Sequence, residues 1–238
     1  MSANPLTLLR TRTYLRKFGK VFATIFLTCI VSIGVIFGVT KFFTIRTIEV
    51  EGAGVQVVVD QKKLAKNLLF FPSEQLRLQL LSANPLLGNV EIHKKFPHTL
   101  VIVAFLRTPI GRLQSNNRLV DLDKDGVVVK EGIHDDALPL LIFDVTPIHI
   151  GDKMSDVRIV QSLAALSAFQ SFVKIDTITS LDSQSLQVKF GKTSIYITQN
   201  ENIQEIAATL QTLLAGFRIK GTLPTIIDLR FTKPVVSF

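Results

Sequence analysis

The residues best suited to chemistry form one short cluster, in the order Asp121, Asp123, Asp125 and Gly126. Their spacing matches the D-x-D-x-D-G opening of a calcium loop, whose carboxylate oxygens bind the ion. The glutamate required at the twelfth position of that loop is replaced by Gly132. The flanks are rich in β-branched residues, which favours a β-hairpin that turns at Asp125-Gly126. We therefore expect no metal site here and keep calcium binding as the alternative.

The four histidines show no spacing typical of a catalytic or metal site. They are His93, His98, His134 and His149. No pair follows the H-x₃-H or H-E-x-x-H pattern, and the sequence has no G-x-S-x-G motif and no glycine-rich phosphate loop. Asp135 and Asp136 are adjacent rather than placed to face each other across a cleft. We expect no catalytic residues and no cofactor, so the sequence predicts a protein that is not an enzyme.

A long uncharged stretch decides how the rest of the chain is interpreted. It runs from Val21 to Thr40 between Lys20 and Lys41. A helix of that length covers about 30 Å, the thickness of a bilayer's hydrocarbon core. A cleaved signal peptide is the alternative, but its apolar part is normally shorter and ends in an A-x-A-like site. We predict a retained single transmembrane helix over residues 21–42.

The charges beside this stretch predict its orientation. Five basic residues and no acid precede it: Arg10, Arg12, Arg16, Lys17 and Lys20. Lys41 and Arg46 follow it, together with Glu49 and Glu51. Positive charge concentrates on the cytoplasmic side, so residues 1–20 form a cytoplasmic tail and the remainder is extracytoplasmic. So short a basic tail offers no nucleic-acid-binding context, and we expect no nucleic acid partner.

The exported part must be stabilised by packing. The sole cysteine, Cys29, lies within the apolar stretch, so no disulfide is available beyond it. Roughly 195 residues follow the anchor, enough for one large or two small domains.

The chain after the anchor alternates strand and helix patterns that predict an α+β protein. The expected elements of the first part are a strand at 43–51, a helix at 61–69 capped by Asp60, a helix from Pro72 to Asn84-Pro85, and strands at 88–94 and 99–106. The second part predicts a helix that starts at Ser155 or Asp156, strands at 175–181, 185–190 and 193–198, a helix capped by Asn200 and ended by Gly216 and Gly221, and a strand at 224–231. We assign the apolar stripe of the helix capped by Asn200 to the core.

The segment from Asn84 to Leu113 resembles the POTRA domain of the bacterial division proteins FtsQ and DivIB. The matching residues are Asn84-Pro85, Lys94-Lys95-Phe96-Pro97, Thr99-Leu100 and Arg107-Thr108-Pro109-Ile110. Family members usually have an acidic residue directly before the arginine, whereas this chain has Leu106 there. A salt bridge that the family makes from that position is therefore not expected here. A second resemblance lies at Ile227–Phe231, where IDLRF is similar to the strand that closes the β-domain of this family, with Val235-Val236 as its tail.

The resemblance implies a βααββ POTRA domain at 43–112 and a mixed α/β β-domain at 113–238. It also implies a bitopic scaffold of the divisome in the cytoplasmic membrane at the division septum. Such a scaffold recruits small bitopic proteins of the FtsL and FtsB kind and helps control septal peptidoglycan synthesis. The alternatives are a membrane-anchored envelope enzyme and a transporter accessory subunit.

Strand addition at an open sheet edge is the physical route that we expect for partner binding. The candidate partner-binding residues are Asp228, Leu229, Arg230, Phe231, Val235 and Val236. A guanidinium can hold a carboxylate with two hydrogen bonds, which favours Arg230, and the resemblance adds Phe231. The alternation of 225–231 places Ile227, Leu229 and Phe231 on one face and leaves open which face is buried.

Overall fold

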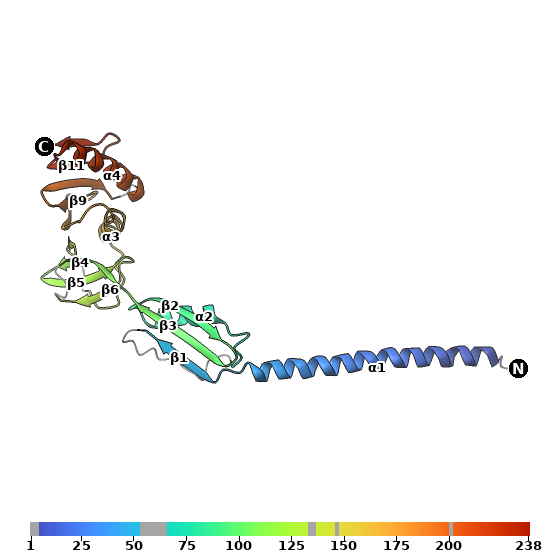
Figure 1. Ribbon diagram of the computed structural model, residues 1–238. Helices are drawn as coiled ribbons and strands as arrows, with labels where there is room; N and C mark the ends of the chain where they lie inside the picture. The colour runs from blue at the N-terminus through green and yellow to red at the C-terminus, as the bar shows by residue number, and fades with distance from the viewer. Residues whose placement is uncertain (1–4, 53–65, 133–136, 146–147, 200–201) are drawn as a thin grey trace. The chain divides into compact units, whose positions relative to one another are not determined.

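The computed structural model describes residues 5–52, 66–132, 137–145, 148–199 and 202–238, and side chains from residue 24 onward. The chain divides into two compact units. The first comprises Met1–Gln79 and Glu91–Ala104, and the second comprises Leu80–Val90 and Phe105–Phe238. Figure 1 shows a long N-terminal helix followed by sheet-rich parts, so the mixed α+β class expected from the sequence is confirmed.

The N-terminal helix α1 extends from Pro5 to Phe42. Its part from Thr24 to Phe42 is long and apolar enough to cross a membrane, and none of that part is buried within the chain. An apolar helix without protein cover is unfavourable in water, whereas a bilayer would solvate it. The segment is therefore a candidate membrane span, within the 21–42 expected from the sequence.

A three-stranded sheet with strand order β1-β3-β2 follows α1. Its strands are β1 (Thr47–Glu51), β2 (Leu87–Lys95) and β3 (Thr99–Leu106), and the helix α2 (Ser73–Ala83) lies between β1 and β2 in the chain. β1 pairs in parallel with β3. Leu68, Leu76, Leu100 and Ile102 are buried and form the core of this part.

A nine-stranded sheet forms most of the second unit, in the order β12-β11-β10-β9-β8-β7-β4-β5-β6. The bounds are β4 (Pro109–Ser115), β5 (Arg118–Asp123), β6 (Val128–Glu131), β7 (Leu140–Ile142), β8 (Thr177–Ser180), β9 (Ser185–Phe190), β10 (Thr193–Thr198), β11 (Ile226–Asp228) and β12 (Val235–Ser237). Parallel pairs join β7 to both β4 and β8, and β10 to β11, while the other neighbours are antiparallel. β12 and β6 are therefore the two outer strands of this sheet.

Two helices pack against each other and contribute to the core of the sheet (Figure 1). The helix α3 (Val157–Phe169) begins after Asp156, whose side chain accepts a hydrogen bond from the Arg158 N–H. The helix α4 (Ile203–Lys220) begins after Asn202, which caps the Gln204 N–H, and ends at Gly221 in the left-handed region. The apolar stripe of α4 is core, as expected, because Ile206, Ala207, Leu210 and Leu214 are buried.

Several expected boundaries are wrong. Asn202 rather than Asn200 caps α4, Gly216 lies within this helix, and Asn200 itself is outside the described residues. Most of the helix expected at 61–69 also lies outside them, and residues 66–69 are bend, bridge and turn. The strand expected at 224–231 is only Ile226–Asp228, because the Asp228 side chain accepts the Arg230 N–H and turns the backbone.

Candidate partner-binding edge

The outer strand β12 is short and exposed. It pairs antiparallel with β11 through Ile226↔Ser237, Ile227↔Val236 and Asp228↔Val235. All three of its residues are exposed. Thr225 N donates to Ser237 O at 2.8 Å, and the Phe238 ring contacts Phe217 of α4 at 5.8 Å between centroids. These contacts hold the end of β12 against the domain while its other side carries no strand among the described residues.

The pairing of β11 fixes which backbone groups of β12 point outward. Ser194 N donates to Thr225 O, and Leu229 N donates to Tyr196 O, both toward β10. In this parallel register the N–H and C=O of Ile227 also point toward β10. Ile227 and Val236 are therefore a non-hydrogen-bonded pair, and the N–H and C=O of Val236 point to the open edge. The N–H and C=O groups of Val235 and Ser237 point toward β11.

The turn after β11 is organised by Asp228. Its carboxylate accepts from Arg230 N at 3.1 Å, from Arg230 Nε at 2.9 Å and from Arg230 Nη2 at 2.6 Å. Asp182 lies 3.9 Å from Arg230 Nη1, and the guanidinium sits 5.4 Å from the Tyr196 ring centroid and 5.8 Å from that of Phe231. The arginine is thus fixed in orientation by four neighbours, and only about a quarter of its side chain is exposed.

The same contacts set the ionisation of this pair. Hydrogen bonds from Arg230 hold the pKa of Asp228 below its ordinary value, and the Asp228 carboxylate raises the pKa of Arg230. The pKa of Asp182 is also lowered, first by its hydrogen bond from the Gln184 backbone and in part by Arg230. The cluster stays ionised at neutral pH and carries two carboxylates for one guanidinium.

A groove of about 690 Å³ lies beside this turn. Glu205, Ile206 and Thr209 of α4 form one wall, and the segment from Leu229 to Pro234 forms the other. Phe231 lines it and is mostly exposed. The groove offers apolar side chains, two basic residues (Arg230 and Lys233) and the acidic Glu205 next to the open strand, which suits side chains of an added peptide.

The candidate residues from the sequence fall into two groups. Phe231, Val235 and Val236 are exposed, whereas Asp228 and Leu229 are buried or nearly so. Arg230 is partly exposed, and its guanidinium bonds the Asp228 carboxylate. The alternation left open by the sequence is now resolved, because Ile227 and Leu229 face the core and Phe231 turns away after the strand ends. Tyr196 and Asp182 were missed, since only the tertiary fold brings them to Arg230.

The aspartates of the β5–β6 hairpin bind arginines. Arg112 Nε donates to Asp121 Oδ1 at 2.8 Å, with both side chains buried. Arg107 Nη1 bonds both Asp123 and Asp125, and its Nε donates to Pro85 O at 2.8 Å. Asp123 Oδ1 also accepts from Asp125 N and Val127 N, and Gly126 adopts a left-handed φ of 80°. The described residues contain no group of three or more His, Cys, Asp or Glu able to hold a metal ion.

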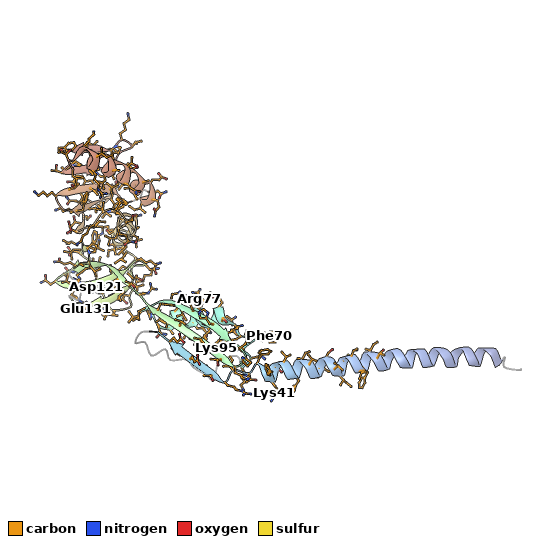
Figure 2. All side chains as sticks on the ribbon, in the orientation of Figure 1. Lys41, Phe70, Arg77, Lys95, Asp121 and Glu131 are labelled. Carbon is orange, nitrogen blue, oxygen red and sulfur yellow. The ribbon has the colours of Figure 1, made fainter. Side chains whose placement is uncertain are left out.

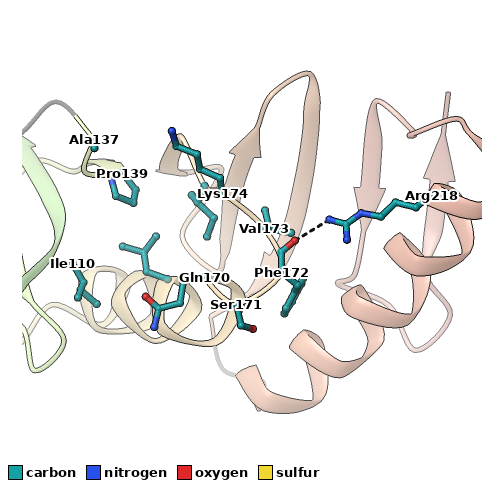
Figure 3. A pocket seen from close by; sticks show the side chains of 11 residues that line it. Ile110, Ala137, Pro139, Gln170, Ser171, Phe172, Val173, Lys174 and Arg218 are labelled. Atoms are coloured by element: carbon teal, nitrogen blue, oxygen red, sulfur yellow. Dashed lines mark hydrogen bonds between the residues drawn. The ribbon is translucent and has the colours of Figure 1, made fainter.

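A second hollow, of about 450 Å³, lies between α3, α4 and the start of β7. Figure 3 shows Arg218 donating to Phe172 O, a bond of 2.9 Å, while Gln170, Ser171 and Lys174 line the same space. These polar groups could hydrogen-bond a ligand. The lining contains neither a histidine nor a carboxylate to serve as a general base.

Comparison with known proteins adds to this geometry. A family model described as cell division protein FtsQ/DivIB, C-terminal, matches residues 111–230, half of the chain. No curated protein matches the sequence. A similar solved structure is the major extracytoplasmic domain of the trans isomer of the bacterial cell division protein DivIB from Geobacillus stearothermophilus. It is 14% identical, with a TM-score of 0.33, over 49% of this chain and 97% of that chain. So low a score carries no argument about fold or function.

Proposed function

Because the chain belongs to the FtsQ/DivIB family of cell division proteins, we propose that it is a membrane-anchored scaffold of the divisome. In this proposal α1 crosses the cytoplasmic membrane once, with residues 1–20 inside and both sheets outside, at the division septum. The basic residues before the apolar stretch favour that orientation. The protein recruits small bitopic partners of the FtsL and FtsB kind and helps control septal peptidoglycan synthesis, without catalysis of its own.

The observation that carries the proposal is the open side of β12. Val236 directs its N–H and C=O outward, and these groups can pair with an extended segment of a partner. Strand addition supplies affinity through the backbone, while pockets for alternate side chains supply selectivity. In this proposal Phe231 and the groove that it lines beside Arg230 receive such side chains.

Proline substitutions in β12 test the pairing. Val236→Pro removes an outward N–H, which costs the complex roughly 1 kcal/mol and lowers its affinity about fivefold or more. The unbound protein loses no bond to β11, so its circular dichroism and melting temperature should change little. Val235→Pro is the matched control, because it removes an inward donor and should lower stability as well. The measurement is co-purification of the partner with the full-length protein from membranes.

Charge reversal tests the groove. Arg230→Glu would place a third carboxylate beside Asp228 and Asp182 and release the turn that presents Phe231. We expect weaker partner recovery with a folded domain. Lys233→Glu is the matched control, because it makes the same change of charge in the same segment of the groove, Leu229 to Pro234, and leaves Arg230 in place. Undiminished recovery with both Val236→Pro and Arg230→Glu would contradict strand addition at β12.

A further inference from the structure

The residues around the end of α1 form an exposed surface of aromatic and basic side chains. We call it the membrane-proximal surface and define it by Phe42, Phe70, Phe96, Lys41, Arg46 and Lys95, all exposed. Phe70 is 72% exposed, more than any other phenylalanine among the described side chains. Figure 2 shows Lys41, Phe70 and Lys95 where α1 meets the three-stranded sheet. Large apolar side chains left exposed in a group usually mark an interaction surface.

Hydrogen bonds attach this surface directly to the last turn of α1. The Asn67 side chain donates to Thr40 O at 3.1 Å, and Leu68 N donates to Phe43 O at 2.7 Å. The Asn67 side chain also accepts from Leu69 N at 2.9 Å. These bonds place the loop that carries Phe70 against the point where the apolar helix ends. The depth of α1 in a bilayer would therefore set the height of Phe70 relative to the membrane surface.

The β2–β3 turn is attached in the same way. The Phe43 ring packs edge-on against Phe96 at 5.6 Å between centroids, and Phe42 lies 5.8 Å from the His98 ring. Arg46 N donates to His98 O at 2.9 Å. Phe96 consequently lies beside the same helix end as Phe70, although the two belong to different segments of the chain.

The charge around these rings is mainly positive. Among the described residues, Lys41 and Arg46 have no ion-pair partner, and Lys94 Nζ bonds Leu69 O at 3.2 Å. Lys95 is paired with Glu49 at 3.7 Å, so its charge is partly offset. Phenylalanine rings beside lysine and arginine suit the boundary of a bilayer, where rings enter the acyl region and cations meet lipid phosphates.

We propose that the membrane-proximal surface binds the outer face of the bilayer that α1 spans, with Phe70 and Phe96 inserted and the cations on anionic headgroups. This inference rests on the anchoring role proposed for α1. Contact with the bilayer would limit the motion of the three-stranded sheet relative to α1. The bilayer is the expected partner of this surface, because hydrogen bonds join the surface to the end of the candidate membrane span.

The absence of tryptophan from the sequence allows a direct test. Phe70→Trp gives a full-length protein with a single tryptophan on the surface, and Ile219→Trp gives a matched control at an exposed position on α4. Each is reconstituted in vesicles of phosphatidylcholine with phosphatidylglycerol, some carrying bromine on the acyl chains. We expect blue-shifted emission and severalfold stronger quenching at position 70 than at position 219. Phosphatidylcholine alone, or Lys41→Gln with Arg46→Gln, should reduce both effects, while Lys41→Arg with Arg46→Lys should preserve them.

The outcomes separate this inference from the anchor. Solvent-like, unquenched emission at position 70 in protein that resists alkaline carbonate extraction would overturn it and leave the anchor intact. Quenching that is equal at both positions, or independent of the anionic lipid, would also overturn it. Extraction of the unsubstituted protein by carbonate would contradict the anchor itself.

Discussion

The two outer strands of the nine-stranded sheet differ in what covers them. The segment after β7 lies along the start of β6, where Val128 N donates to Asp152 O and Gly151 N donates to Val128 O, both at 2.9 Å. Met154 N extends this cover by donating to Gly126 O at 2.8 Å. β12 has no such cover among the described residues, and its three residues are exposed. The start of β6 is thus protected against pairing, whereas the edge of β12 remains available for it.

The side chains near the two edges differ in the same sense. At the β6 end, buried or partly buried ion pairs of Arg112 and Arg107 with hairpin aspartates fix the structure. At the β12 end, Arg230 and its neighbours lie beside an open groove. We therefore expect substitutions near β6 to change stability, and substitutions near β12 to change partner binding.

The largest expected effect is on stability at the protected end. Arg112→Met would leave the Asp121 carboxylate buried without the guanidinium that bonds it. Removal of one member of a buried pair costs about 3–5 kcal/mol in unfolding free energy. Denaturant unfolding of the purified protein measures this loss. Arg112→Met with Asp121→Leu should recover much of it, because no buried charge remains.

A smaller effect is expected in the cover of β6. Gly151 has a φ of 91°, so Gly151→Val should cost about 1–2 kcal/mol and lower the melting temperature by several degrees. Gly151→Asn is the control and should lose less, since asparagine tolerates positive φ better. Partner recovery from membranes should not change. A loss of recovery as large as that of Val236→Pro would remove the distinction between the edges.

The smallest effect concerns the pH dependence at β12. The folded-state pKa of Asp228 lies below its ordinary value of 3.8, so the Arg230 pair stabilises the fold fully above that pH. This contribution disappears as the pH falls through the lowered folded-state pKa. Asp228→Asn removes this contribution, which is about 1 kcal/mol or less for an ion pair at the protein surface. The difference in melting temperature between the two proteins should therefore shrink as the pH falls from 3.8 through the lowered folded-state pKa of Asp228; a constant difference would contradict the pairing.

Local patterns in the sequence predicted most of the regular structure of the second unit. β9 and β10 have the expected bounds, and the stripe of α4 is buried, because alternation and helical periodicity depend on neighbours in the chain. β4 and β7 were not predicted as strands. Leu141 of β7 is buried between β4 and β8, a placement that depends on parallel pairing between distant segments.

The candidate site was predicted less completely than the fold. Arg230 and the exposed Phe231 could be selected from residue type and family resemblance. The role of Asp228 in ending β11 early could not, because it depends on a side-chain bond that competes with the strand. The arginine partners of the hairpin aspartates were also missed, since Arg107 and Asp123 are distant in the sequence and meet only in the folded second unit.

Amide hydrogen exchange at β12 tests the central claim most directly. In the full-length protein alone, the N–H of Val236 should exchange rapidly, while that of Val235, which points toward β11, is protected. Addition of an FtsB-like partner should slow exchange at Val236 severalfold or more and leave the amides of β6 unchanged. Partner binding without any new protection at Val236 would contradict strand addition at this edge.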